Sequence, residues 1–162
     1  MKAFDKKTAR KKLYRALFLL IVVLVSKYVS DTYFQVMLIH GDSMEPSYHN
    51  MQFVLIDKRV QTVHTGDVVA FRCEGLHAIL VKRVVAESGQ TAVIRGGRLF
   101  VAGKESTLYE GTIFSYAGIL SKEIVLAVGV YIVIGDNTEE SKDSRYECVG
   151  IIQENDIIGR VV

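Results

Sequence analysis

The sequence predicts a mostly β protein, built of coiled antiparallel sheets, with one apolar helix at its N-terminus. Short runs of apolar and β-branched residues recur along the chain, and Gly-Asp or Gly-Gly pairs punctuate them. This pattern is typical of antiparallel strands joined by tight turns. Ahead of these runs stands one longer apolar stretch, which follows a cluster of lysine and arginine residues.

The size and charge of the chain limit what it can be. Its 162 residues, of which 49% are hydrophobic, suffice for one domain with a sizeable core and a separate N-terminal segment. The net charge of +2 is too close to balance to favour a nucleic-acid-binding protein. We therefore expect no nucleic-acid partner.

The N-terminal region divides into a basic leader at residues 1–15 and an apolar segment at residues 16–35, ahead of a β-rich domain at residues 36–162. The unbroken apolar run is Ala16–Val25, which is short beside the ~20 residues of a full membrane span. Lys27, just beyond this run, can extend its ammonium group to the membrane surface. We expect the segment to be a transmembrane signal anchor.

Two other interpretations of the apolar segment compete with the anchor. A cleaved signal peptide needs small residues at alternate positions, and Val25–Asp31 contains no Ala-x-Ala-like site. A buried core helix is disfavoured by the basic leader. With an anchor, the positive-inside rule places the N-terminus in the cytoplasm and the β-rich domain on the extracytoplasmic face of the cytoplasmic membrane.

The apolar runs after the anchor have the length and composition of β-strands. Lys82 and Arg83 fall in one of them and should point to opposite faces, because strand side chains alternate. Gly96-Gly97 is a hairpin signal, and Glu105–Ser121 is expected to be a loop or weak strands. The expected strand regions are Val36–Ile39, Phe53–Ile56, Val68–Phe71, Ala78–Val85, Thr91–Ile94, Leu99–Val101, the apolar run Ile124–Ile134, Ile151–Ile152 and Ile157–Val162.

The segment Gly41-Asp42-Ser43-Met44-Glu45-Pro46 is the candidate centre of the chemistry. Pro46 is the only proline in the chain. It fixes its own φ and disfavours a helical conformation at Glu45, which predicts a rigid, extended-to-turn loop. Gly41 permits a close backbone approach. Ser43 on such a loop is a candidate nucleophile, with an ordinary turn serine as an equal alternative from this segment alone.

A serine hydroxyl needs a base to act as a nucleophile. None of the four histidines stands in a recognisable motif with an orienting carboxylate, so a Ser/His triad is disfavoured. Lys82 interrupts an apolar strand, where burial favours the neutral amine that can accept a proton. For a lysine considered alone, a solvated position on a strand face is the simpler interpretation.

Three stretches, taken together, favour the catalytic interpretation. They are Ser43-Met44-x-Pro46, the Lys82-Arg83 pair after the strand Gly66-Asp67-Val68-Val69-x-Phe71, and Gly135-Asp136-Asn137 followed by Ser141-x-Asp143-Ser144-Arg145. In this order they resemble the type I signal peptidases, membrane-anchored Ser/Lys proteases that cut leader peptides from exported proteins. The resemblance covers about residue 36 to the C-terminus. Any one motif is weak, whereas three in order behind a basic and then apolar N-terminus form a strong signal.

The resemblance implies a Ser/Lys dyad that needs no metal and no cofactor. Ser43 matches the nucleophile. Lys82 matches the general base, which deprotonates Ser43 and later the water that hydrolyses the acyl-enzyme.

The resemblance also implies supporting roles for five further residues. Ser141 matches the hydroxyl that holds the lysine amine, and Asp143 with Arg145 matches a charged pair that buttresses the site. Asp136 is expected to pair with Arg83. From the residues alone, these Asp-Asn and Asp-Ser clusters can equally be polar turns that close a strand.

The loop and the cleft follow the same resemblance. The backbone N–H of Ser43 is expected to contribute to the oxyanion hole. Gly41 stands where some family members place a serine whose hydroxyl also donates, which leaves the second donor open. Met44 is expected in the core or the pocket wall, and Ile39 and Leu80 in the substrate cleft. In the family, the end of the leader binds as an added strand and small side chains are recognised.

The implied partners are preprotein signal peptides, the lipid bilayer, and secretion or conjugation machinery. Alternatives are a specialised pilin-maturing leader peptidase of a conjugation system and a non-catalytic signal-peptidase-like assembly factor, which should lack the serine or the lysine. A self-cleaving repressor-type Ser/Lys domain would need a helix-turn-helix, for which the N-terminus has no room. Cys73 and Cys148 lack zinc-ligand spacing and are either one disulfide or two separate thiols.

Overall fold

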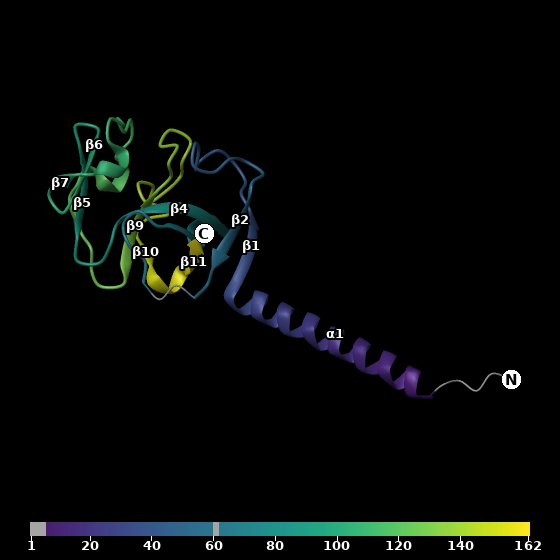
Figure 1. The fold of residues 1–162 in the computed structure, drawn as a ribbon. Helices are drawn as coiled ribbons and strands as arrows, with labels where there is room; N and C mark the ends of the chain where they lie inside the picture. The colour runs from purple at the N-terminus through teal and green to yellow at the C-terminus, as the bar shows by residue number, and fades with distance from the viewer. Residues whose placement is uncertain (1–5, 60–61) are drawn as a thin grey trace.

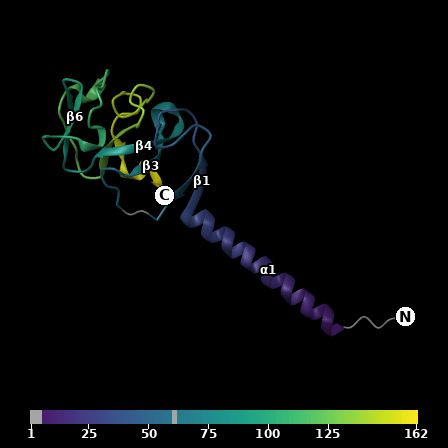
Figure 2. The same ribbon diagram turned by 45° about the horizontal axis from the view of Figure 1, so that its top comes forward.

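The structure is a computed structural model that describes residues 6–59 and 62–162. It contains helix α1 (Lys6–Tyr33), which projects away from the strands as a straight rod in both ribbon views (Figures 1 and 2). The helix contains no glycine or proline, so nothing in its sequence interrupts it. Residue Lys2 of the predicted basic leader lies outside the described residues.

Helix α1 joins most of the predicted leader to the predicted anchor as one element. Its segment Thr8–Tyr33 is long and apolar enough to cross a membrane. The apolar side chains of the segment are exposed, because the helix does not pack on the β domain. Strand β1 (Phe34–Leu38) follows directly, two residues earlier than the expected start at Val36. The boundaries at residues 15 and 35 stay predictions.

The strands form two antiparallel sheets, which confirms the predicted fold class. The larger sheet has the order β1-β2-β11-β3-β4-β9-β10. Its strands after β1 are β2 (Phe53–Asp57), β3 (Val68–Cys73), β4 (Ala78–Ala86), β9 (Val130–Ile134), β10 (Ile152–Gln153) and β11 (Ile157–Val161). The first and last strands of the chain thus lie close together in the sheet, because β11 is inserted between β2 and β3.

A smaller sheet is formed by the chain between β4 and β9 and has the order β7-β6-β5-β8. Its strands are β5 (Thr91–Arg95), β6 (Arg98–Val101), β7 (Lys104–Glu105) and β8 (Ile124–Val125). Gly96 and Gly97 both have positive φ at the β5–β6 turn, as the two-glycine hairpin predicted. In Figures 1 and 2, β6 lies on the opposite side of the β domain from α1.

Two regions differ from the expected strands. The apolar run Ile124–Ile134 is divided at Gly129, which has a φ of +76°, so that β8 joins the small sheet and β9 the large one. The region Glu105–Ser121 contains two 3₁₀ turns, at Thr107–Tyr109 and Gly118–Ser121.

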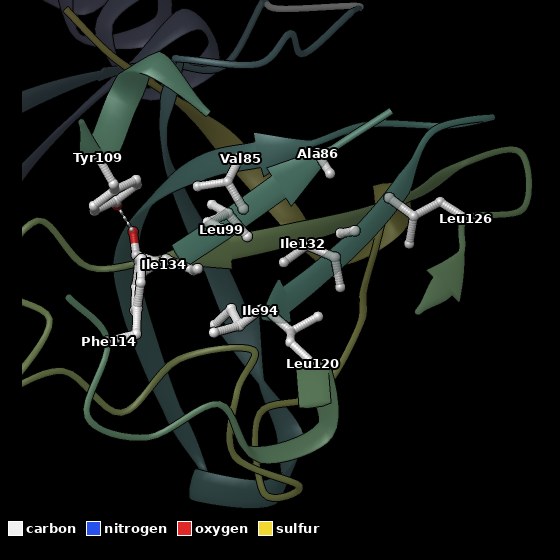
Figure 3. Packing of buried hydrophobic residues seen from close by; sticks show 11 residues of the cluster. Val85, Ala86, Ile94, Leu99, Tyr109, Phe114, Leu120, Leu126, Ile132 and Ile134 are labelled. Atoms are coloured by element: carbon white, nitrogen blue, oxygen red, sulfur yellow. Dashed lines mark hydrogen bonds between the residues drawn. The ribbon is translucent and has the colours of Figure 1, made fainter. Parts of the chain in front are cut away.

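Among the described residues, the buried hydrophobic side chains form three clusters, and two of them support the candidate site. One cluster lies between the two sheets and is built from β4, β9, the small sheet and the two 3₁₀ turns (Figure 3). Another lies beneath the serine loop and includes Ile39, Met44, Val68 and Ala70. Met44 is fully buried, as expected of a core residue next to the serine. One cluster therefore packs against the turn that carries Ser43, and the other packs against β9.

The two cysteines are separate thiols in this structure. Cys73 is buried at the end of β3, and Cys148 is exposed. The Cys73 thiol lies 3.5 Å from the backbone carbonyl oxygen of Cys148.

Candidate active site

Ser43 lies in a turn that connects β1 to β2. Gly41 begins this turn with a φ of +88°, and a Cβ there would meet nothing within 4 Å, so backbone conformation is what requires glycine at this position. Its N–H donates to Asn50 Oδ1 at 3.0 Å. The peptide bond before Pro46 is cis. The turn closes through the Tyr48 N–H, which donates to the Met44 carbonyl at 2.9 Å.

Lys82 brings its amine to the serine hydroxyl. Lys82 Nζ lies 2.7 Å from Ser43 Oγ and donates to the backbone carbonyl of Val81 at 3.0 Å. The lysine is on β4, where Lys82 pairs with Val69 of β3. A shift of one residue in this register would turn Arg83 toward the serine instead. The two sequence-predicted residues, 39 positions apart, are thus in hydrogen-bond contact.

The environment of Lys82 favours its neutral form. The residue is 4% exposed. Burial lowers the pKa of Lys82 from 10.5 to about 8, although the negative charges of Asp143 and Asp136 oppose the shift. A neutral amine this close to Ser43 can accept the hydroxyl proton.

Ser141 does not make the contact that the resemblance implies. Its hydroxyl oxygen is buried and has no hydrogen-bond partner in the described structure, while the Lys82 amine contacts Ser43 and Val81. Ser141 nevertheless lies at the site, because a Cβ on Gly135 would clash with its Oγ. The same Cβ would clash with the backbone carbonyl oxygen of Ser43, so only glycine fits between the two serines.

Asp143 and Arg145 form a buried ion pair behind Ser141, with exposed fractions of 0% and 1%. Arg145 Nε and Nη2 donate to the two carboxylate oxygens at 2.8 and 2.9 Å. Arg145 Nη2 also donates to the carbonyl of Thr138 at 2.7 Å, and Asp143 Oδ2 accepts from the Gly135 N–H at 3.1 Å. Because the charges are paired and hydrogen-bonded, the pair fixes the segment after β9, that is, residues 135–151 between β9 and β10.

Arg83 and Asp136 form a second ion pair at the site. Arg83 Nε donates to Asp136 Oδ1 at 2.7 Å, and Nη2 donates to Oδ2 at 2.5 Å. Arg83 also donates to the Gly66 carbonyl at 2.9 Å and to the Ser47 hydroxyl at 3.2 Å. This guanidinium therefore links β4, the serine turn, the turn before β3 and the segment after β9.

A cleft of about 280 Å³ opens at the Ser43–Lys82 pair. Both Ile39 and Leu80 line it, and the other lining residues are Met37, Leu38, His40, Ser43, Met44, Ile79, Val81 and Lys82. The cleft therefore lies between β1 and β4, strands that are not neighbours in the sheet, so the sheet must coil to bring them together. Among the described residues, the part of β4 that lines the cleft pairs on one side only, with β3.

Sequence reasoning missed several groups at this site. The Asn137 N–H donates to the Ser43 carbonyl at 3.1 Å, a contact that holds the serine turn against the segment after β9. Ser144 is fully buried, and its hydroxyl accepts from the Val133 N–H at 3.0 Å. Tyr109 reaches the backbone at Ile134 from a region expected to be loop or weak strands. Asn137 and Ser144 both stand in the third motif, which was the available signal for them, whereas no motif marked Tyr109.

The Ser43 hydroxyl and the Lys82 amine both line the cleft and are in hydrogen-bond contact there. The described residues contain no cluster of three or more His, Cys, Asp or Glu side chains arranged to hold a metal ion. A nucleophile in contact with a base is the arrangement that acyl transfer requires.

Comparison with known proteins identifies the family. The family described as "Signal peptidase, peptidase S26" matches residues 11–162. The chain belongs to this signal peptidase family. Membership makes it a serine peptidase that cleaves leader peptides, in agreement with the motifs and the fold.

Individual proteins that are similar to this chain agree with its assignment to the signal peptidase family. The chain is 30% identical to Signal peptidase I V of Bacillus subtilis over 138 residues, which cover 75% of this chain and 79% of the relative. It is 29% identical to Signal peptidase IB of Staphylococcus aureus over 160 residues, which cover 87% and 80%. A crystal structure of a signal peptidase I from Enterococcus faecalis superposes with a TM-score of 0.53 at 20% identity, covering 64% of this chain and 99% of the other. That likeness supports the fold.

Proposed function

We propose that this serine peptidase acts through a Ser43/Lys82 dyad on an N-terminal leader peptide. The observation that carries the proposal is the 2.7 Å contact between Lys82 Nζ and Ser43 Oγ, in residues that both line the cleft. No histidine is needed, because the buried amine is itself a base close to neutral pH.

The proposed reaction has two steps. In acylation, neutral Lys82 takes the proton of Ser43 Oγ as that oxygen attacks the scissile carbonyl. The resulting ammonium then protonates the leaving amine. In deacylation, the neutral amine takes a proton from water, whose oxygen attacks the ester carbonyl. The ester bond to Ser43 Oγ then breaks, the Lys82 ammonium returns the proton to that oxygen, and the leader leaves with a free carboxylate. The backbone N–H of Ser43 is the proposed oxyanion donor.

The cleft suits an extended peptide. The lining part of β4 is unpaired on one side among the described residues, and β1 is an edge strand, so a peptide can add between them through backbone hydrogen bonds. The side-chain lining is mainly aliphatic, with Ile39, Leu80 and Met44 near the dyad. We propose that small leader side chains fit there.

We further propose that α1 anchors the chain in the cytoplasmic membrane, with its N-terminus cytoplasmic and the β domain outside. The exposed apolar side chains of α1 support this, and so does the basic sequence of its first turns. Apolar exposure continues onto the sheet beside the helix, where Val36 of β1 is 65% exposed and Phe53 of β2 is 71% exposed. This surface would place the cleft near the bilayer.

The test of the dyad uses full-length protein in detergent and a precursor with a small-x-small leader site. Wild type should cut at that site. Ser43→Ala and Lys82→Met should be folded and inactive, and Arg95→Ala, far from the cleft on the small sheet, should cut like wild type. The kcat/KM of wild type should rise with pH to a plateau with an apparent pKa near 8, because the base must be neutral. Equal activity of wild type and Ser43→Ala would refute the dyad.

A further inference from the structure

Tyr109 lies outside every motif that the sequence singled out, yet it reaches the segment that supports the serine turn. It ends the 3₁₀ turn Thr107–Tyr109, in the chain that forms the small sheet, and is 7% exposed. Its hydroxyl donates to the backbone carbonyls of Ile134 at 3.3 Å and Gly135 at 3.4 Å. Figure 3 shows the ring beside the apolar cluster with its oxygen directed at the Ile134 carbonyl.

The hydroxyl is not explained by packing. Tyr109 belongs to a cluster that is otherwise hydrophobic, and its ring centroid lies 5.4 Å from that of Phe114. A phenylalanine would fill this space equally well, and a buried hydroxyl is costly unless it is hydrogen-bonded. Burial also raises the pKa of Tyr109, so the hydroxyl keeps its proton and remains a donor. The two carbonyls therefore account for the oxygen at this position.

The backbone at Ile134 and Gly135, which Tyr109 contacts, belongs to the segment that supports the Ser43–Lys82 pair. The Gly135 N–H donates to Asp143 at 3.1 Å, so Asp143 and Tyr109 fix Gly135 through its N–H and its carbonyl. The next residue, Asp136, pairs with Arg83, and the N–H of Asn137 donates to the Ser43 carbonyl at 3.1 Å. A displacement at Gly135 would thus be passed to the serine turn within two residues.

The connection between β7 and β8, which contains Tyr109, also contacts the segment after β9 at Arg145. The Ile119 N–H donates to the Arg145 carbonyl at 2.9 Å, and Arg145 Nη1 donates to the Tyr116 carbonyl at 3.4 Å. A Cβ on Gly118 would clash with the Arg145 carbonyl oxygen, which shows how closely the two chain segments approach. The connection between β7 and β8 therefore holds the segment after β9 at two places, Gly135 and Arg145.

We propose that Tyr109 is a positioning residue: its hydroxyl fixes the backbone at Ile134–Gly135 and so keeps Ser43 Oγ within reach of Lys82 Nζ. The inference rests on the proposed Ser43/Lys82 dyad. It gives the connection between β7 and β8 a part in the reaction, since that connection carries the group that sets the geometry of the dyad.

The test compares Tyr109→Phe with wild type in the precursor-cleavage assay, with full-length protein in detergent. A hydrogen bond of this kind is worth about 0.5–1.5 kcal/mol, so kcat should fall roughly 2- to 10-fold. KM should stay within about 2-fold, because Tyr109 does not line the cleft. The acid limb of the kcat/KM profile should move to higher pH, because a looser dyad leaves Lys82 better solvated.

Two further variants separate positioning from stability. Tyr131→Phe removes a hydroxyl from another buried tyrosine, on β9 in a different cluster, and should leave kcat and the pH profile unchanged. Replacing Tyr109 by 4-aminophenylalanine keeps a donor on the same ring and should restore most of the lost kcat. This arm also keeps the test valid if the phenylalanine variant is poorly folded.

Ser43→Ala in the same assay distinguishes the two proposals. If Ser43→Ala is inactive while Tyr109→Phe has wild-type kcat and pH profile, the dyad stands and the inference about Tyr109 is wrong. An equal loss of kcat in Tyr131→Phe, or a change confined to KM, would also overturn it. If Ser43→Ala remains active, the dyad and the positioning role fail together.

Discussion

Lys82 destabilises the fold at neutral pH because burial disfavours its charge. The difference between a pKa of 10.5 in the unfolded chain and about 8 in the folded one corresponds to about 3 kcal/mol. This penalty is fully present below about pH 8, where both states are protonated. It is relieved as pH rises from about 8 to 10.5, where the unfolded chain binds more protons.

Replacing Lys82 with methionine should therefore abolish cleavage and raise stability at pH 7. We expect a gain of up to about 3 kcal/mol in the free energy of unfolding, since methionine fills the space without a charge. Denaturant unfolding of wild type and Lys82→Met at pH 7 and pH 10 measures this. The gain should shrink strongly at pH 10; a constant difference would mean that the amine is not responsible.

Ser141 has a buried hydroxyl without a partner among the described residues. An unsatisfied hydroxyl contributes nothing favourable, so Ser141→Ala should leave the free energy of unfolding within about 0.5 kcal/mol or raise it. If the hydroxyl holds the lysine amine during the reaction, as the family resemblance implies, kcat should nevertheless fall at least about 10-fold. Denaturant unfolding and cleavage kinetics on the same preparation test both parts. Unchanged kcat would remove Ser141 from the mechanism.

The segment between β9 and β10 owes its shape to the buried Asp143–Arg145 pair. Asp143→Asn removes the negative charge and leaves the guanidinium of Arg145 buried without a counter-charge. We expect a loss of about 3–5 kcal/mol in the free energy of unfolding. Denaturant unfolding at neutral pH measures it.

Two comparisons show whether the cause is the unpaired charge. Asp143→Asn combined with Arg145→Met should recover part of the lost stability, because the unpaired charge is gone. Glu105→Gln breaks the exposed pair between Arg98 and Glu105 on the small sheet and should change stability little. A similar small effect for Asp143→Asn would mean that the buried pair is not holding the segment.

The whole molecule consists of a membrane-type helix and a β domain that share few contacts. Lys58 connects them, since its amine donates to the Asp31 carbonyl at 2.6 Å and its N–H to the Tyr33 carbonyl at 2.9 Å. Removing residues 1–30 keeps these contacts and deletes exposed apolar surface. The truncated protein should move from the membrane pellet to the supernatant, and its unfolding midpoint should change little. Complete retention in the carbonate-washed pellet would show that α1 is not the main anchor.

Local sequence signals predicted the parts of this protein that depend on neighbours in the chain. Gly96-Gly97 predicted the β5–β6 hairpin, since positive φ at both positions is a property of the residues themselves. The apolar stretch likewise predicted a helix suited to a membrane, because length and hydropathy are also properties of the local sequence. The break at Gly129 was missed because a single glycine inside an apolar run does not show which sheet each half will join.

The chemical identity of the site is carried by residue types in order, so the Ser43, Lys82 and Asp143 motifs were sufficient to indicate a family and a reaction. The contacts were set by long-range pairing. Register in β4 turns Lys82 rather than Arg83 toward the serine, and Tyr109 meets Ile134 because two sheets pack on a shared core. Such contacts depend on the summed packing of distant strands, for which no single stretch of sequence holds the information.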